Sequence, residues 1–157
     1  MKNSQGSIMS CMAHKVLSIN HIGIVVDDFE EAKAFFEDFG FVTQGEQDEQ
    51  SELLDKVARV AGAKSHIAFM ESPSGQINIE LTKFIKPTTI SRGENNQIYT
   101  HGIQHICLVV EDIDEIVDSI RQKGRELITE VEQYDDSYKL CYFRGPDGII
   151  IELAERL

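Results

Sequence analysis

The chain has 157 residues, of which 41% are hydrophobic and 27% charged, with 27 acidic and 15 basic side chains and a formal net charge of −12. This length and apolar content are enough for one globular unit with a real core, or for two very small units. The acidic balance argues against a nucleic-acid partner and against anionic membrane surfaces, because both carry negative charge and are bound through basic residues.

No apolar stretch approaches the roughly 20 residues that span a bilayer. Residues 1–16 are expected to form an N-terminal arm, and their apolar residues are too scattered for a signal peptide. The three cysteines, Cys11, Cys107 and Cys141, are widely spaced and odd in number, which favours reduced thiols, with Cys107 and Cys141 as small buried hydrophobes. These features predict a cytoplasmic protein without a membrane partner.

An internal repeat is the strongest feature of the sequence. His21–Asp28 (HIGIVVDD) and His105–Asp112 (HICLVVED) align without a gap. Farther along, Pro73–Leu81 is similar to Pro146–Leu153, with one extra residue in the first copy. So many ordered matches indicate two copies of one module.

The first copy covers residues 17–82. Its β-branched run Ile19–Val26 predicts a strand, and Asp28 with Glu31 forms a capping box at the start of a helix that ends at Gly40. Three strands are expected next, over Phe41–Glu46, Ile67–Glu71 and Gln76–Thr82, with a short amphipathic helix inserted within Ser51–Gly62.

Residues 83–101 separate the two copies. They contain Pro87, Gly93, threonines and asparagines, a composition that predicts a linker or a flap over a pocket.

The second copy covers residues 102–157 and repeats the order of the first. Ile103–Val110 predicts a strand, and Asp112 with Glu115 predicts a second capping box before a helix that ends at Gly124. Three strands are expected over Leu127–Tyr134, Tyr138–Arg144 and Ile149–Ala154. The predicted fold class is therefore α+β, with two tandem βαβββ modules.

Each module carries one histidine on its first strand and one glutamate on its last. Strand alternation places His21 with Gly23 and Val25 on the face away from the helix, and His105 takes the corresponding place in the second module. A carboxylate within an apolar strand is costly unless it has a partner. The other histidines, His14, His66 and His101, have no repeated counterpart and are expected to be structural.

The duplicated pair predicts a divalent-metal site, if the modules pair about a pseudo-twofold axis. Its ligands would be His21, Glu80, His105 and Glu152. Two imidazole nitrogens and two carboxylates suit six-coordinate Ni, Co, Mn or Mg, or Zn with expanded coordination.

With these four residues, the two modules resemble the vicinal oxygen chelate superfamily, which includes glyoxalase I, methylmalonyl-CoA epimerase, extradiol dioxygenases, fosfomycin-resistance proteins and bleomycin-binding proteins. The resemblance covers residues 17–155. It implies sheets that curl around a divalent metal, with open coordination positions for neighbouring oxygens of a small-molecule substrate. It also implies a homodimer, and leaves open whether the four ligands come from one chain or two.

The ligand set is most similar to that of glyoxalase I. This resemblance implies a lyase or isomerase that moves a proton through a metal-stabilised enediolate on a 2-oxo, thiohemiacetal or acyl-thioester substrate. Glu152 is the first candidate for the base and Glu80 the second. The stretch Thr82–Lys86 departs from the glyoxalase I pattern associated with glutathione.

Two alternatives from other classes remain open. An extradiol-type dioxygenase would use Fe(II) and a coordination position freed from Glu80. A non-catalytic protein that binds an antibiotic or another small molecule would resemble the bleomycin-binding members, which usually lack the metal ligands.

The expected substrate pocket is lined by polar and aromatic strand residues. Arg144 would suit a substrate carboxylate or phosphate, and the tyrosines could instead be ordinary half-buried strand residues. The candidates are Asn78, Tyr134, Tyr138, Tyr142 and Arg144.

Overall fold

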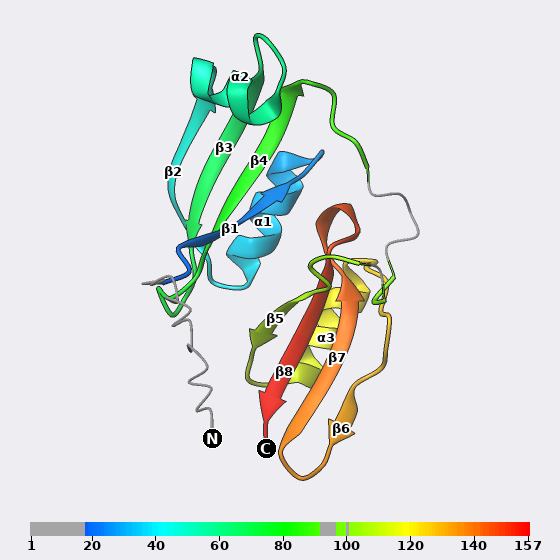
Figure 1. Cartoon of the computed structure of the whole chain (residues 1–157). Helices are drawn as coiled ribbons and strands as arrows, with labels where there is room; N and C mark the ends of the chain where they lie inside the picture. Colours follow the sequence, from blue (N-terminus) through cyan, green and yellow to red (C-terminus); the bar gives the residue numbers. More distant parts are fainter. Residues whose placement is uncertain (1–17, 92–96, 100) are drawn as a thin grey trace, which may run out of the picture.

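The computed structural model describes residues 18–91, 97–99 and 101–157 (Figure 1). The expected N-terminal arm, with Cys11 and His14, lies outside these residues. None of the helices in the described part of the chain is long and apolar enough to cross a membrane.

Two βαβββ modules follow each other along the chain (Figure 1). The elements of the first are β1 (His21–Val25), α1 (Phe29–Asp38), β2 (Val42–Glu49), α2 (Glu52–Ala58), β3 (Lys64–Glu71) and β4 (Asn78–Lys86). Those of the second are β5 (Ile106–Val109), α3 (Ile113–Gln122), β6 (Glu132–Tyr134), β7 (Tyr138–Arg144), the 3₁₀ turn Pro146–Gly148 and β8 (Ile150–Arg156).

The two sheets have the same topology, with strand orders β1-β4-β3-β2 and β5-β8-β7-β6. In each sheet the first strand of the module pairs in parallel with the last, and the other neighbours are antiparallel. This confirms the predicted α+β class and the tandem βαβββ order, including the inserted helix α2.

The two long helices begin differently, although the sequence predicts the same capping box for both. Asp28 Oδ1 accepts a hydrogen bond from the Glu31 amide at 3.0 Å, as predicted. Asp112 instead adopts a left-handed conformation, with φ 55° and no capping bond from its side chain. The carboxylate of Glu155 accepts from the amides of Asp112 and Ile113, so β8 supplies the acceptor and the predicted second capping box is wrong.

Most strand boundaries differ from expectation by one to three residues; β5, predicted over Ile103–Val110, covers Ile106–Val109, so His105 lies directly before it. Two strands differ by more. β4 continues past Thr82 to Lys86, because Lys83 and Phe84 pair with His66 and Ser65 of β3. The predicted strand over Leu127–Tyr134 is reduced to β6 with a single isolated bridge from Leu127 to Phe143.

One hydrophobic core joins the two modules, and α1 is the element that they share. Ala32 and Phe36 of this helix are fully buried against their own sheet. Its Phe35 and Phe39 lie against Phe143 of β7, with ring centroids 6.0 and 6.4 Å apart. The modules are therefore packed into one unit.

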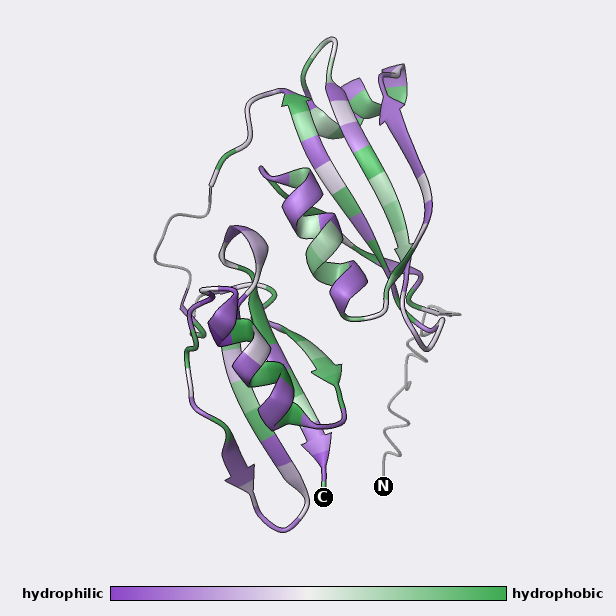
Figure 2. Cartoon of the chain, turned by 180° about the vertical axis from the view of Figure 1, so that it is seen from behind, coloured by the Kyte–Doolittle hydropathy of each residue, from purple (hydrophilic) through white to green (hydrophobic). Residues whose placement is uncertain are grey.

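A charged contact lies beside this junction between Phe35, Phe39 and Phe143. The Arg125 guanidinium lies over the Phe35 ring, 4.7 Å from its centroid, and also pairs with the carboxylate of Glu31. Figure 2 shows α1 and α3 on the same side of the molecule, in front of their sheets. The sheet faces that carry the predicted metal ligands consequently turn to the opposite side.

Removing the aromatic junction should destabilise both modules together. Phe143→Ala is expected to lower the free energy of unfolding by about 3–5 kcal/mol, because it empties a fully buried site. Chemical denaturation should still give a single transition. Phe69→Ala is the matched control, since Phe69 is exposed on the outer sheet face and its loss should cost less than about 1 kcal/mol. Two separate transitions, with only one shifted by Phe143→Ala, would contradict the shared core.

His66 has the structural role expected of a histidine without a repeated counterpart. Its Nδ1 lies 2.6 Å from Asp48 Oδ1 and its Nε2 lies 2.9 Å from Glu46 Oε1, so both ring nitrogens hold the edge strand β2. Both hydrogen bonds form together only when the ring carries a proton on each nitrogen, because each nitrogen must donate to a carboxylate oxygen. The hydrogen bonds that the ring donates to Glu46 and, to a smaller extent, to Asp48 raise the pKa of His66 above its ordinary value.

This cluster should make stability depend on pH. The folded-state pKa of His66 lies above the unfolded value, so its contribution is fully present below about pH 6.5 and is lost as the pH rises through the folded-state pKa. His66→Gln should therefore destabilise by about 0.5–1 kcal/mol at about pH 6 and by less at about pH 9, measured by urea unfolding. His101→Gln is the control, because exposed His101 stands outside this cluster. A difference that grows with pH would show that the assignment is wrong.

Candidate functional site

Each sheet presents a histidine and a glutamate on the face away from its helix. His21 Nε2 lies 3.9 Å from Glu80 Oε2, and this pair is called the first half-site. His105 Nε2 lies 2.8 Å from Glu152 Oε2, and this pair is called the second half-site. The pairing predicted from the repeat is thus present in both modules.

Strand register explains both pairs. Parallel pairing of β1 with β4 sets His21 opposite Asn78 and Gly23 opposite Glu80. In the second module, parallel pairing of β5 with β8 sets Cys107 opposite Glu152. Since residues two apart share a sheet face, each histidine reaches the glutamate that is diagonal to it.

A side-chain amide supports each histidine from behind. The Nδ1 atom of His21 lies 2.8 Å from Asn20 Oδ1, and that of His105 lies 2.7 Å from Gln104 Oε1. In both half-sites Nε2 is therefore the nitrogen that faces the carboxylate. These two residues were not among the predicted site residues, although an amide residue directly precedes each histidine of the repeat.

The donor atoms fit a divalent metal, and the second half-site fits it more closely. Two neighbouring ligands of a six-coordinate ion with bonds of about 2.1 Å are about 3 Å apart. The 2.8 Å between His105 Nε2 and Glu152 Oε2 is close to this separation. An imidazole lone pair and a carboxylate oxygen at that distance repel each other unless a cation or a proton lies between them. The wider first half-site, at 3.9 Å, requires Glu80 to move toward the ion.

The two half-sites do not merge within one chain. Among residues 18–91, 97–99 and 101–157, no three His, Cys, Asp or Glu side chains form a group that could hold a metal ion. The four predicted ligands are thus brought together as two pairs, and their convergence on one ion stays a prediction.

The second half-site has polar neighbours on both sides of its glutamate. Glu152 lies in register with Cys107 of β5 and Tyr142 of β7. The His105 ring meets the Tyr142 ring edge-on, with centroids 5.5 Å apart. Desolvation, the charge of Glu152 and a hydrogen bond to that carboxylate raise the pKa of the Tyr142 phenol. Tyr142, one of the predicted pocket residues, therefore stands directly at this half-site.

Cys107 differs from its prediction as a small buried hydrophobe. The residue is exposed, because it lies on the outer sheet face, whereas Cys141 is buried as predicted. Desolvation of the sulfur and the nearby charge of Glu152 raise the pKa of the Cys107 thiol to about 11. The thiol is thus a weak hydrogen-bond donor toward Glu152 at neutral pH.

The first half-site is more open and more apolar. Glu80 lies in register with Gly23 and Phe69, and a side chain at Gly23 would meet only open space. The side-chain oxygen of Asn78, a predicted pocket residue, is buried without a hydrogen-bond partner in the described part of the chain. Such an orphaned acceptor is costly, so it marks a place where a ligand or ordered water would bind.

The other predicted pocket residues lie farther from the glutamates. Tyr138 stands at the opposite end of β7 from Arg144, and its hydroxyl accepts a hydrogen bond of 3.2 Å from Arg156 Nε. Tyr134 pairs with Tyr138 at the exposed edge strand β6. Arg144 Nη1 donates to the Gly148 carbonyl at 3.4 Å, beside the 3₁₀ turn. Of the five candidates, Asn78 and Tyr142 are the ones that adjoin the half-sites.

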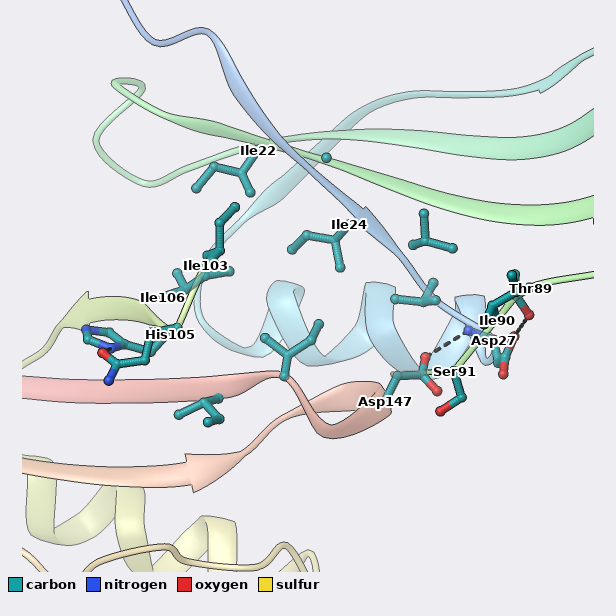
Figure 3. A pocket seen from close by; sticks show the side chains of 16 residues that line it. Ile22, Ile24, Asp27, Thr89, Ile90, Ser91, Ile103, His105, Ile106 and Asp147 are labelled. Atoms are coloured by element: carbon teal, nitrogen blue, oxygen red, sulfur yellow. Dashed lines mark hydrogen bonds between the residues drawn. The ribbon is translucent and has the colours of Figure 1, made fainter. Parts of the chain in front are cut away.

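A cavity of about 360 Å³ lies between the two modules. Its walls are mainly aliphatic side chains of β1 and of the segments that precede β5 and β8. Figure 3 shows His105 at one end and Asp27, Thr89 and Asp147 together at the other. Thr89 donates to Asp27 Oδ1, and the Asp27 amide donates to Asp147 Oδ2 at 2.8 Å. Residues 89–91 therefore border the cavity, and the role of residues 83–101 as a linker or a flap stays a prediction.

Comparison with known proteins identifies a family and similar folds. The family described as Glyoxalase/Bleomycin resistance protein/Dioxygenase superfamily matches residues 18–153. The uncharacterized protein YaeR of Escherichia coli is 30% identical over 141 residues, which cover 88% of this chain and 95% of YaeR. The crystal structure of a glyoxalase family protein from Bacillus cereus is 37% identical, with a TM-score of 0.86 and coverage of 93% of this chain and 98% of that chain.

A third comparison concerns the fold alone. FosX of Listeria monocytogenes, a fosfomycin resistance protein whose E126Q mutant was solved with Mn(II) and a dihydroxypropylphosphonic acid, is 20% identical with a TM-score of 0.61. The alignment covers 88% of this chain and 90% of that chain.

Proposed function

Because the chain belongs to the glyoxalase/bleomycin resistance protein/dioxygenase superfamily, we propose that it is a divalent-metal-dependent lyase or isomerase of the glyoxalase I type. The observation that carries the proposal is the duplicated pair of histidine Nε2 and glutamate oxygen on the outer face of each sheet. The proposed metal ligands are His21, Glu80, His105 and Glu152, and the candidate ions are Ni, Zn, Co, Mn and Mg.

The proposed reaction moves a proton at the carbon beside a carbonyl of a small 2-oxo, thiohemiacetal or acyl-thioester substrate. The metal supplies Lewis-acid stabilisation of the negative charge that develops on the substrate oxygen. Glu152 is the first candidate to take the proton and return it, and Glu80 is the second. Tyr142, which lies in register beside Glu152, would orient that carboxylate.

The surroundings of the two glutamates differ, so the proposed pocket has an apolar part beside Glu80 and a polar part beside Glu152. Gly23 and Phe69 leave an open apolar space beside Glu80, which suits the hydrocarbon part of a substrate. The orphaned oxygen of Asn78 would accept a hydrogen bond from a substrate hydroxyl or amide. Tyr142 offers a phenol on the other side, beside Glu152.

We further propose that the site is completed by a second copy of the chain. One chain offers the four ligands as two separate pairs, and exposed apolar side chains accompany them on the same sheet faces. Val25 is 53% exposed and Val109 is 73% exposed. A homodimer in which the first half-site of one chain meets the second half-site of the other would cover these residues and give two equivalent metal sites.

One observation favours a second candidate function, an extradiol-type dioxygenase. His21 and Glu80 are 3.9 Å apart, so Glu80 is the ligand that the geometry holds least firmly. Without it, His21, His105 and Glu152 would form the two-histidine, one-carboxylate set that suits Fe(II). In that case Glu80→Gln should retain the metal, and the protein should consume oxygen with a catechol.

The first test measures metal content and turnover. Protein purified without added metal should contain about one divalent ion per chain by elemental analysis, and should turn over methylglyoxal with a thiol or epimerise an acyl-CoA. Glu152→Gln should lower kcat by about 10²-fold or more when metal is bound, because the base is lost. Glu132→Gln, an exposed glutamate of the same sheet, is the control. Full turnover by metal-loaded Glu152→Gln would exclude Glu152 as the base, and failure to bind any divalent metal would exclude the enzymatic proposal.

The second test asks whether one site uses two chains. His21→Ala disables the first half-site and Glu152→Ala the second, so each variant alone should be inactive. After the two variants are mixed under conditions that exchange subunits, half of the sites in each mixed dimer should combine intact half-sites and recover activity. If each chain builds its own complete site, the mixed dimers cannot recover activity. Mixed dimers that are shown to form but stay inactive would therefore refute the shared site.

A further inference from the structure

We infer that Gly23 is a specificity-determining residue, whose missing side chain lets an uncharged aliphatic chain pass from the first half-site into the cavity between the modules. This names a substrate class, a 2-oxo compound that carries such a chain. The part that concerns the metal rests on the proposed function. The part that concerns the glycine and the cavity rests on the packing of the protein alone.

Neither the backbone conformation nor the packing among the described residues requires a glycine at position 23. Gly23 lies in the parallel ladder between β1 and β4, opposite Glu80, and its φ is outside the left-handed region that favours glycine. Apart from its chain neighbours, no described atom lies within 4 Å of where a Cβ atom would stand. Glycine inside a strand costs stability, and commonly marks a place where a ligand or another backbone comes close.

The corresponding position of the second module carries a side chain. Cys107 lies opposite Glu152 in β8, as Gly23 lies opposite Glu80 in β4. A thiol therefore stands beside the glutamate of the second half-site, whereas the space beside the glutamate of the first half-site is open. The two half-sites share their ligands and differ in this neighbour, so the room for a substrate group lies at the first half-site.

Gly23 is also one of the residues that line the cavity of about 360 Å³ between the modules. The cavity borders every residue of Ile22–Asp27, and β1 pairs with β4 alone in the described part of the chain. The cavity therefore runs along the open edge of β1, and Gly23 is the point where it meets the first half-site. Figure 3 shows aliphatic side chains of both modules around this space, Ile22, Ile24, Ile103 and Ile106.

The walls and the far end of the cavity define the group that fits. Aliphatic walls favour a hydrocarbon chain, because each methylene that leaves water there tightens binding about threefold to fourfold. A volume of about 360 Å³ is small for a ligand pocket, so the chain is short. Asp27 lies four residues beyond Gly23, about 13 Å along the strand direction, and its amide donates to the Asp147 carboxylate. These two carboxylates would repel a chain that ends in a negative charge.

Three substitutions test the opening at Gly23. Gly23→Val adds a β-branched side chain, which suits a strand and would close the opening. Gly23→Ala adds a single methyl group. Gly45→Val is the matched control, because Gly45 is a strand glycine of the same sheet with open space around it. It lies opposite Phe69, two strands away from Glu80.

The first readout is the melting temperature of the metal-free protein. Gly23→Ala should raise it by about 1–4 °C, because alanine fits the extended strand without a steric clash and removes the entropic cost of glycine. A lower melting temperature would show that the fold itself needs the glycine, and would overturn the inference.

The second readout is the binding of 2-oxo acids to Zn²⁺-loaded protein, measured by calorimetry. The wild-type protein should bind 2-oxohexanoate at least about 10-fold more tightly than pyruvate, which lacks the chain. It should bind 2-oxoadipate, which ends in a second carboxylate, more weakly than 2-oxohexanoate. Gly23→Val should lose the preference for 2-oxohexanoate over pyruvate, and Gly45→Val should keep it. A wild-type protein without this preference, or an unchanged preference in Gly23→Val, would overturn the inference.

The third readout tests the cavity without the metal. In metal-free wild-type protein, 1-hexanol should shift the backbone amide NMR signals of residues 22–27 and 103–106. Unshifted signals would overturn the cavity as the place of the chain. If the wild-type protein binds no divalent metal, the proposed function fails together with the 2-oxo head group, while 1-hexanol and the melting temperatures still decide the roles of the cavity and of Gly23.

Discussion

The site depends above all on the parallel pairing between the first and last strands of each module. In register, β1 and β4 place His21 diagonally across from Glu80, and β5 and β8 do the same for His105 and Glu152. Both pairs lie on the outer sheet faces because the aliphatic residues between them pack on the helices. A shift of one residue in either pairing would turn a ligand into the core. The hydrophobic pattern that fixes the register therefore also fixes the candidate chemistry.

The shared core settles where these faces point. Since α1 packs on its own sheet and on Phe143 of the other module, both helices occupy one side of the molecule and both half-sites open on the other. The same packing leaves the half-sites apart within one chain. The proposed completion by a second copy would unite the four ligands without breaking the core.

The sequence was sufficient to predict features that repeat or alternate. The two modules, their element order and the pairing of each histidine with a glutamate follow from the internal repeat and strand periodicity. Features set by distant contacts were not predictable: the helix start at Asp112 is capped from Glu155, and Gln104 is anchored by the Ile98 carbonyl. The relative position of the half-sites also depends on packing between modules, which no local pattern encodes. Cys107 was expected in the core because its strand is apolar on both sides, and only the register shows that it faces outward beside Glu152.

The most direct test of the shared site is the number of imidazole ligands per metal ion, measured by X-ray absorption spectroscopy on protein loaded with one equivalent of Zn²⁺ or Ni²⁺ per chain. If two half-sites meet around each ion, the spectra should show two imidazole nitrogens, from His21 and His105, together with carboxylate oxygens. A single imidazole per ion would show that each half-site binds metal separately, and would contradict the convergence on which the proposed function rests.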